Sequence, residues 1–173
     1  MILPALQEAE NPYWRPIKYS LFPPLGLATL AAYFSDEDDV EIQDQHVEKL
    51  TLDDTPDLVC IQVYVTNAYR AYKIADSYRQ RGVYVAMGGL HVTSLPDEAA
   101  QHADTILLGP GEESFPRFVK DLREGHPQKR YVANWRSLEN IPPVRRDLIK
   151  REKYFVPNSL VVSRGCPHHC DFC

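Results

Sequence analysis

The run Leu58-Val-Cys-Ile-Gln-Val63, the segment Asn67–Arg81 and the run Val83-Tyr-Val-Ala-Met87 together determine the fold class. The two outer runs are short and apolar, which is typical of strands that are buried on both faces of a sheet. The middle segment repeats apolar residues at helical spacing, with Asn67 suited to begin a helix and Gly82 to end it. A strand, a helix and a second strand in this order predict a parallel pair joined by a crossover helix.

Strand-like runs continue outward from this unit in both directions. They predict three further short strands, at Ile2–Leu6, Val40–Gln43 and Thr105–Leu108. With the two central strands they make five, and the segments between them are long enough for crossover helices. Residues 1–125 are therefore predicted to form an α/β domain with a doubly wound, five-stranded parallel sheet.

Two more helices are predicted around these strands. Leu25–Phe34 is apolar on nearly all sides, which indicates a well-buried helix. A second helix ends at Gly125 and carries the apolar stripe Phe115, Phe118, Val119 and Leu122. We place Pro116 in the first turn of that helix, where the missing backbone N–H removes no internal hydrogen bond.

The character of the sequence changes after residue 125. Proline-rich clusters and the lack of a sustained period predict an interdomain linker over residues 126–157, with a short hairpin near Tyr131–Val132. Residues 158–173 begin with the run Ser159-Leu-Val-Val-Ser163, which predicts a strand. A strand that delivers potential metal ligands at its carboxyl end is how a β/α barrel starts, and such barrels need about 200 residues. We therefore expect the chain to be the N-terminal part of a longer protein, truncated after the first strand of a second domain.

Composition excludes several classes of function. The 173 residues are 44% apolar and 25% charged, and they carry a formal net charge of −5. That charge argues against a nucleic-acid partner, because phosphate binding needs a basic face. No run approaches the roughly 20 apolar residues of a membrane span, and the N-terminus lacks the basic region of a secretory signal. Four cysteines without a leader favour a reducing, cytoplasmic location and metal binding over disulfides.

Glycine-rich loops follow two of the predicted strands. Gly88-Gly-Leu-His91 comes after the fourth strand and Gly109-Pro-Gly-Glu-Glu113 after the fifth. Ligands of such sheets bind at the carboxyl ends of the strands, and glycine lets the backbone approach a ligand closely. Tight turns alone would also explain these glycines, but two such loops in register favour binding. A dinucleotide site is not indicated, since the G-x-G-x-x-G spacing is absent.

The last eight residues, Cys166-Pro-His-His-Cys-Asp-Phe-Cys173, carry the clearest chemical signal. Three thiolates at the spacing C-x3-C-x2-C can hold three irons of a cubane cluster and leave the fourth iron open for a small molecule. A zinc site completed by His168 or His169 is the alternative, but zinc ligands usually come from two clusters well apart in sequence. Cys60 stands alone in a predicted strand and is interpreted as a small buried apolar residue.

This cysteine loop, read together with Arg164-Gly165 before it, resembles the cluster loop of the radical S-adenosylmethionine (radical SAM) superfamily. Two regions upstream, Phe22–Ala32 and Met87–Glu98, and a third, Ala103–Glu113, are similar to the cobalamin-binding domain that precedes the barrel in the cobalamin-dependent subclass. Pro143–Leu148 resembles the interdomain connection of the same subclass. The resemblance covers essentially the whole chain.

The resemblance implies three cofactors. A [4Fe-4S] cluster would be held by Cys166, Cys170 and Cys173, and S-adenosylmethionine would bind its open iron, with Phe172 near the adenine. Cobalamin would bind at the glycine loops through Tyr64, Thr66, Asn67, Gly88, Gly89, His91, Gly109 and Gly111. The whole enzyme would then be a methyltransferase, or would rearrange an unactivated carbon, with a small-molecule substrate and an electron donor such as flavodoxin or ferredoxin. A stand-alone corrinoid- or nucleotide-binding module remains the other possibility.

One expected cobalamin signal is missing. Many cobalamin domains carry Asp-x-His-x-x-Gly after the first strand, and the histidine binds cobalt. Here Asp44-Gln-His46 follows the second strand instead, and Lys49 stands where the glycine would be. We interpret this match as coincidence and expect cobalamin to bind without a histidine from such a motif.

Overall fold

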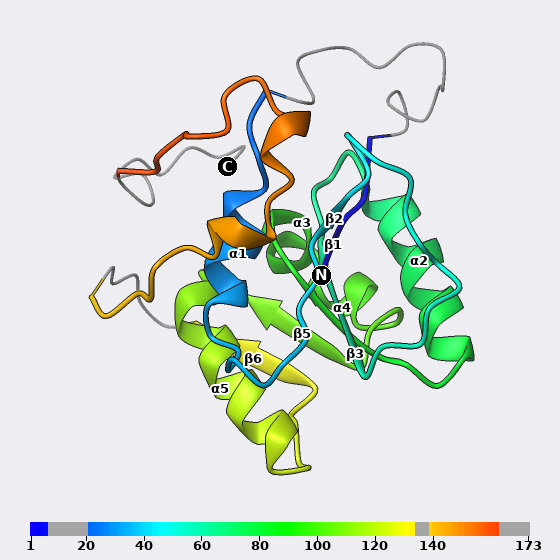
Figure 1. Cartoon of the computed structure of the whole chain (residues 1–173). Coiled ribbons are helices and arrows are strands. Elements are labelled where there is room, and N and C mark those ends of the chain that lie inside the picture. The colour runs from blue at the N-terminus through cyan, green and yellow to red at the C-terminus, as the bar shows by residue number, and fades with distance from the viewer. Residues whose placement is uncertain (7–20, 134–138, 163–173) are drawn as a thin grey trace.

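The computed structural model describes residues 1–6, 21–133 and 139–162 and contains a six-stranded, all-parallel sheet (Figure 1). The strands run in the order β2-β1-β3-β4-β5-β6. Their bounds are Ile2–Leu3 for β1, Gln43–Asp44 for β2, Leu58–Gln62 for β3, Tyr84–Gly88 for β4, Thr105–Leu108 for β5 and Arg130–Val132 for β6. The prediction of a doubly wound parallel α/β sheet is confirmed, with one strand more than the five predicted.

Helices cover both faces of the sheet. Five α-helices lie in the described part of the chain: α1 (Leu25–Ala31), α2 (Ala68–Gln80), α3 (Leu90–Ser94), α4 (Pro96–Ala99) and α5 (Gly111–Arg123). Figure 1 shows α1 and α5 together on one side of the sheet and α2 on the other. The core divides accordingly, because Phe115 and Phe118 of α5 pack on one face while Tyr78 and Ile74 of α2 pack on the opposite face.

The central unit forms as predicted. β3 and β4 pair in parallel over five residues, from Leu58 opposite Tyr84 to Gln62 opposite Gly88. α2 packs its apolar stripe against one face of this strand pair, and Tyr78 and Ala75 are fully buried. Gly82 follows α2 with φ +80°, and Gly125 follows α5 with φ +82°, so both glycines end their helices in the left-handed conformation as predicted.

The hairpin predicted near Tyr131–Val132 is wrong. These residues belong to β6, which pairs in parallel with β5 and places Tyr131 opposite Leu107. The Tyr131 side chain is 1% exposed, its ring lies 5.7 Å from that of Phe118, and its hydroxyl donates to Asp121 Oδ2 at 2.7 Å. Burial raises the pKa of Tyr131 to about 12. The sheet therefore continues past residue 125, the predicted end of the domain.

The predicted place of Pro116 is also wrong. α5 begins at Gly111, so Pro116 is its sixth residue and lies beyond the first turn. Proline has no N–H to donate to the carbonyl four residues earlier, which is that of Glu112. The Tyr33 hydroxyl donates to the Glu112 carbonyl oxygen instead, at 3.2 Å. A side chain from just beyond α1 thus supplies the hydrogen bond that the helix backbone cannot make.

We expect Tyr33→Phe to lower the free energy of unfolding by about 1 kcal/mol, the usual contribution of one hydrogen bond. In a Pro116→Ala background the same substitution should have almost no effect, because the introduced alanine supplies its own N–H to Glu112. Urea unfolding of the two single variants and the double variant measures this coupling. Equal losses from Tyr33→Phe in both backgrounds would contradict the assignment.

Residues 144–156 pack directly against the α/β domain. Val144, Leu148, Ile149 and Tyr154 join the apolar cluster formed by α1, Leu3 and Ile42. This segment contains two short 3-10 turns, Arg146–Leu148 and Arg151–Lys153. Backbone hydrogen bonds fix it at both ends, from Arg145 N to Ala28 O at 3.1 Å and from Val156 N to Leu21 O at 2.9 Å.

Polar contacts add to this packing. The Tyr154 hydroxyl donates to the buried Asp44 carboxylate at 2.9 Å, and Lys150 and Lys153 both contact Glu48 Oε2, at 2.6 and 2.9 Å. Although burial alone would raise it, these two ammonium groups hold the pKa of Glu48 below its ordinary value. Much of the segment predicted as a linker is therefore attached to the domain.

Candidate functional site

The strand order reverses between β1 and β3, and ligands of open α/β sheets bind at the carboxyl end of such a switch point. Four loops meet at this edge: Pro4–Ala5 after β1, Gln45–His46 after β2, Val63–Asn67 after β3, and Gly89 after β4. Gly109 follows β5 at the same edge. The glycine loops and the Tyr64–Asn67 segment predicted as a binding site are thus brought together by the topology.

Asn67 connects two of these loops. It occupies the residue before α2, but its side chain makes no capping hydrogen bond to that helix, in contrast to the prediction. Its Nδ2 donates to Pro4 O at 2.8 Å, and its Oδ1 accepts from the backbone N–H of Tyr64 at 2.8 Å. Since Asn67 is only 3% exposed, it fixes the β1 and β3 loops to each other from inside.

Gln45 holds the other side of the β1 loop. Its Oε1 accepts from the backbone N–H of Ala5 at 3.0 Å and from Arg70 Nε at 2.5 Å. The loop after β1 is therefore held between a side chain from the β2 loop and one from the β3 loop. The switch point is a pre-formed part of the fold.

The four predicted glycines face neighbouring protein atoms. A Cβ on Gly89, whose φ is +115°, would lie 2.6 Å from Val63 O. At Gly111 it would lie 3.0 Å from the Leu30 side chain, at Gly109 (φ +79°) 3.3 Å from Ala133 Cβ, and at Gly88 3.4 Å from Leu107 Cβ. Close packing of the loops and helices therefore favours glycine at 89, 109 and 111, which supports the tight-turn interpretation there, while the 3.4 Å at Gly88 is an ordinary contact distance. Their role as cofactor contacts stays a prediction.

Thr93 is one of the residues at this edge that the sequence did not predict. It lies in α3, where its hydroxyl donates to Gly89 O at 3.1 Å and accepts from the backbone N–H of Gly109 at 3.0 Å. One exposed side chain therefore bridges the two glycine loops. The available signal was its position four residues after Gly89, one helical turn from the loop.

Comparison with known proteins decides the family. A family model described as the B12 binding domain matches residues 19–119, which include α1 to α4, most of α5 and the strands β2 to β5. The chain belongs to the B12-binding domain family.

Curated relatives of this B12-binding domain are named as methyltransferases or methylases. The bacteriochlorophyllide d C-8(2)-methyltransferase of Chlorobaculum tepidum is 32% identical over 86% of the chain, and an uncharacterized methyltransferase of Pyrococcus horikoshii is 34% identical over 87%. The hopanoid C-2 methylase of Rhodopseudomonas palustris is 26% identical over 89%. The chain spans 35%, 40% and 30% of the length of these three relatives, respectively.

The carboxyl edge of this B12-binding domain exposes apolar surface of the kind that a corrin ring can cover. Val65 is 76% exposed, Leu90 is 70% exposed and Tyr64 is 41% exposed. All three follow strands at the carboxyl edge of the sheet. Thr66, beside them, is exposed as well. Cofactor sites combine apolar walls with a few polar groups, so these four residues fit such a group. Only Tyr64 and Thr66 among them were predicted as contacts.

His91 lies beneath the edge. It is 8% exposed, and its Nε2 lies 3.0 Å from the Tyr72 hydroxyl and 3.2 Å from Glu98 Oε1. Hydrogen bonds from Tyr72 and then from His91 hold the pKa of Glu98 below its ordinary value. In the B12-binding domain His91 therefore joins α3 to α2 and α4, and its predicted contact with the cofactor stays untested.

Asp44 and His46 are likewise engaged inside the fold. His46 Nδ1 lies 2.8 Å from Asp44 Oδ1, and the other oxygen of the same carboxylate accepts the Tyr154 hydroxyl. Burial first, and then the Asp44 carboxylate, raises the pKa of Tyr154. This pair stabilises the β2 turn of the B12-binding domain, and the interpretation of Asp44-Gln-His46 as a coincidental match stays a prediction.

The cysteine loop lies outside the described residues, and so do Cys166, Cys170, Cys173, Phe172, His168 and His169. Across the described residues 1–6, 21–133 and 139–162, no group of three His, Cys, Asp or Glu side chains could hold a metal ion. In the same part of the chain, none of the helices has the length and apolar character needed to cross a bilayer.

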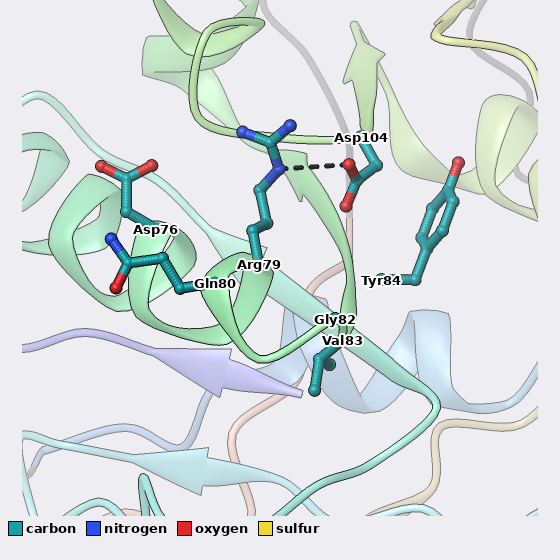
Figure 2. Close-up of a pocket in the computed structure, with 7 residues that line it drawn as sticks. All are labelled: Asp76, Arg79, Gln80, Gly82, Val83, Tyr84 and Asp104. Carbon is teal, nitrogen blue, oxygen red and sulfur yellow. Dashed lines mark hydrogen bonds and ion pairs between the residues drawn. The ribbon is translucent and has the colours of Figure 1, made fainter.

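A hollow of about 450 Å³ lies at the opposite, amino edge of the sheet (Figure 2). It is bordered by the end of α2 and the starts of β4 and β5, and Figure 2 shows Arg79 reaching across to Asp104. Arg79 Nε lies 3.1 Å from Asp104 Oδ1, while Asp104 Oδ2 accepts from the Val85 N–H at 2.9 Å. These charges already have protein partners, so we assign this hollow a structural role.

Proposed function

We propose that the chain is the N-terminal, cofactor-binding part of a cobalamin-dependent radical SAM methyltransferase. The observation that carries this proposal is the succession of two features in one chain. A B12-binding domain, matched over residues 19–119, is followed by three cysteines at the spacing C-x3-C-x2-C. The names of the relatives, which are methyltransferases and methylases, support the type of reaction.

The proposal assigns separate roles to the two features. When bound, cobalamin would supply a transferable methyl group, and the cluster with S-adenosylmethionine would supply a radical able to activate a carbon of the substrate. Tyr64, Val65, Thr66 and Leu90 would cover one side of the corrin and keep water away from it. Cys166, Cys170 and Cys173 would hold the cluster. The small-molecule substrate and an electron donor such as flavodoxin or ferredoxin belong to the whole enzyme.

The exposed run that precedes the cysteines supports further protein at this point. Leu160, Val161 and Val162 are 77%, 56% and 88% exposed, and in the described residues they belong to no strand. The Ser159 hydroxyl is buried and has no hydrogen-bond partner among the described residues. A β-branched apolar run of this kind favours pairing with another strand. The relatives, which are more than twice as long as this chain, have the length to provide one.

Cobalamin binding is tested with the 173-residue protein and hydroxocobalamin. After mixing and gel filtration, we expect the red corrinoid to elute with the protein at about one equivalent. Bovine serum albumin treated in the same way controls for nonspecific adsorption. Elution of all the corrinoid in the small-molecule fraction would contradict the cofactor assignment.

The cluster is tested by anaerobic reconstitution with iron and sulfide. We expect a broad absorbance at about 400 nm that is lost in Cys170→Ala and retained in Cys60→Ala. Cys60 is a suitable control because it is 6% exposed within β3 and burial raises the pKa of its thiol to about 12, so it is a poor ligand. A colourless protein that retains one zinc ion would contradict the cluster and favour the zinc alternative.

A further inference from the structure

The Thr93 hydroxyl makes two hydrogen bonds, one within its own helix turn and one to a loop outside the helix. The hydroxyl donates to Gly89 O, at the loop after β4, and accepts from Gly109 N–H, at the loop after β5. Gly109 is 16 residues away in the sequence. The neighbouring Ser94 provides an internal comparison, because its hydroxyl bonds only to Leu90 O within the helix.

Both loops that Thr93 joins depend on unusual backbone conformations. Gly89 has φ +115° and Gly109 has φ +79°, so each loop is shaped by a glycine in a conformation that other residues rarely adopt. Such glycines have many accessible conformations when nothing holds them. The β4 loop is already attached to β3, since His91 N–H donates to Val63 O at 3.3 Å. The bridge through Thr93 extends this connection to the β5 loop.

We propose that Thr93 is a positioning residue for the corrinoid cofactor, because it fixes the separation of the two glycine loops. This inference rests on the proposed cobalamin binding and adds a residue to it. Leu90, in the same helix, is among the exposed residues that fit the corrin, so a shift of α3 against the β5 loop would move the binding surface. Holding the loops in place before binding removes part of the ordering entropy that the cofactor would otherwise have to offset.

The test compares three variants of the 173-residue protein, Thr93→Val, Thr93→Ser and Ser94→Ala. Valine keeps the shape of threonine but removes both hydrogen bonds, and serine keeps the hydroxyl. Ser94→Ala removes a hydroxyl from the adjacent position of the same helix. In the valine variant, Gly89 O keeps the hydrogen bond from the backbone N–H of residue 93, at 3.1 Å, and because this position is exposed, water can replace the hydroxyl at the Gly109 N–H. We therefore expect the thermal midpoint of this variant to stay close to that of the unmodified protein.

Binding of hydroxocobalamin and hydrogen exchange are the readouts. For Thr93→Val we expect an affinity about 5- to 10-fold lower, the effect that corresponds to the net contribution of about one hydrogen bond, and faster exchange of the Gly109 amide. Thr93→Ser and Ser94→Ala should both bind like the unmodified protein. Unchanged affinity in Thr93→Val, or an equal loss in Ser94→Ala, would overturn the positioning role. Failure of the unmodified protein to bind hydroxocobalamin would instead count against the proposed function itself.

Discussion

Replacing Gly89 with alanine is expected to lower the free energy of unfolding by about 3 to 5 kcal/mol, through combined backbone strain and overpacking. Gly89 has φ +115° and ψ −178°, a region that is essentially limited to glycine. The new Cβ would lie 2.6 Å from Val63 O and 3.0 Å from Val63 N. Both are backbone atoms at the end of β3, which cannot move without disturbing the sheet.

Gly88→Ala is the matched control for this substitution. Gly88 has no positive φ, and its Cβ would lie 3.4 Å from Leu107 Cβ and 3.6 Å from Leu107 O, both ordinary contact distances. We expect the Gly88 variant to lose about 1 kcal/mol or less, the usual range for a tolerated substitution. Urea unfolding followed by circular dichroism measures both. Similar stabilities for the two variants would show that the clash at Val63 is relieved by movement of the loop.

Ending the chain at Ala133 is expected to lower the free energy of unfolding by about 3 to 6 kcal/mol relative to a chain that ends at Val162. The shorter form loses Ile149 and Tyr154, which are 7% and 8% exposed, and the packed side chains of Val144 and Leu148. Burial of one large apolar side chain contributes about 1.5 to 3 kcal/mol, and part of the sum is offset by the entropy of ordering the segment. It also loses the hydrogen bond that the Tyr154 hydroxyl donates to the buried Asp44 carboxylate.

Comparing the two truncated forms isolates the effect of the segment, because both lack the three C-terminal cysteines. Chemical denaturation gives the difference in stability, and binding of a hydrophobic dye reports whether the apolar surface of α1 becomes exposed. We expect more dye binding by the shorter form, because the apolar surface of α1 adds to the apolar residues that both forms expose. Equal stability of the two forms would mean that the segment contributes nothing to the folded state and connects domains only.

The fold was predictable where local patterns were strong. The β3-α2-β4 unit has continuous apolar strands, a helical stripe and a terminating glycine, so each part of the sequence agrees with the others. β6 was missed because only Tyr131 is buried among its three residues, and a single apolar residue between exposed neighbours gives no period. α3 and α4 are five and four residues long, too short for a stripe to appear.

The position of Pro116 shows a different limit. Proline in a helix interior is unfavourable on local grounds, so placing it in the first turn was the reasonable choice. The structure tolerates it because Tyr33, 79 residues from Glu112, provides the missing donor. No local pattern can report a contact over that separation.

The sequence predicted which edge of the sheet carries the candidate site, but not the side-chain contacts that shape it. Gly88, Gly89, Gly109 and Gly111 do lie at the carboxyl edge, since glycine pairs after strands mark loops there. The side chains that fix these loops were not foreseen, because the roles of Thr93 and Gln45 depend on partners elsewhere in the sequence. Asn67 was assigned to the right position but to the wrong hydrogen bonds.

The hydrogen bond from Tyr33 to Glu112 limits which substitutions homologues can accept at positions 33 and 116. A homologue that replaces the proline regains a backbone donor and is then free to lose the phenol. One that keeps the proline must retain a donor at position 33 or accept a weaker helix. The two positions should therefore covary among homologues, although they are far apart in the sequence.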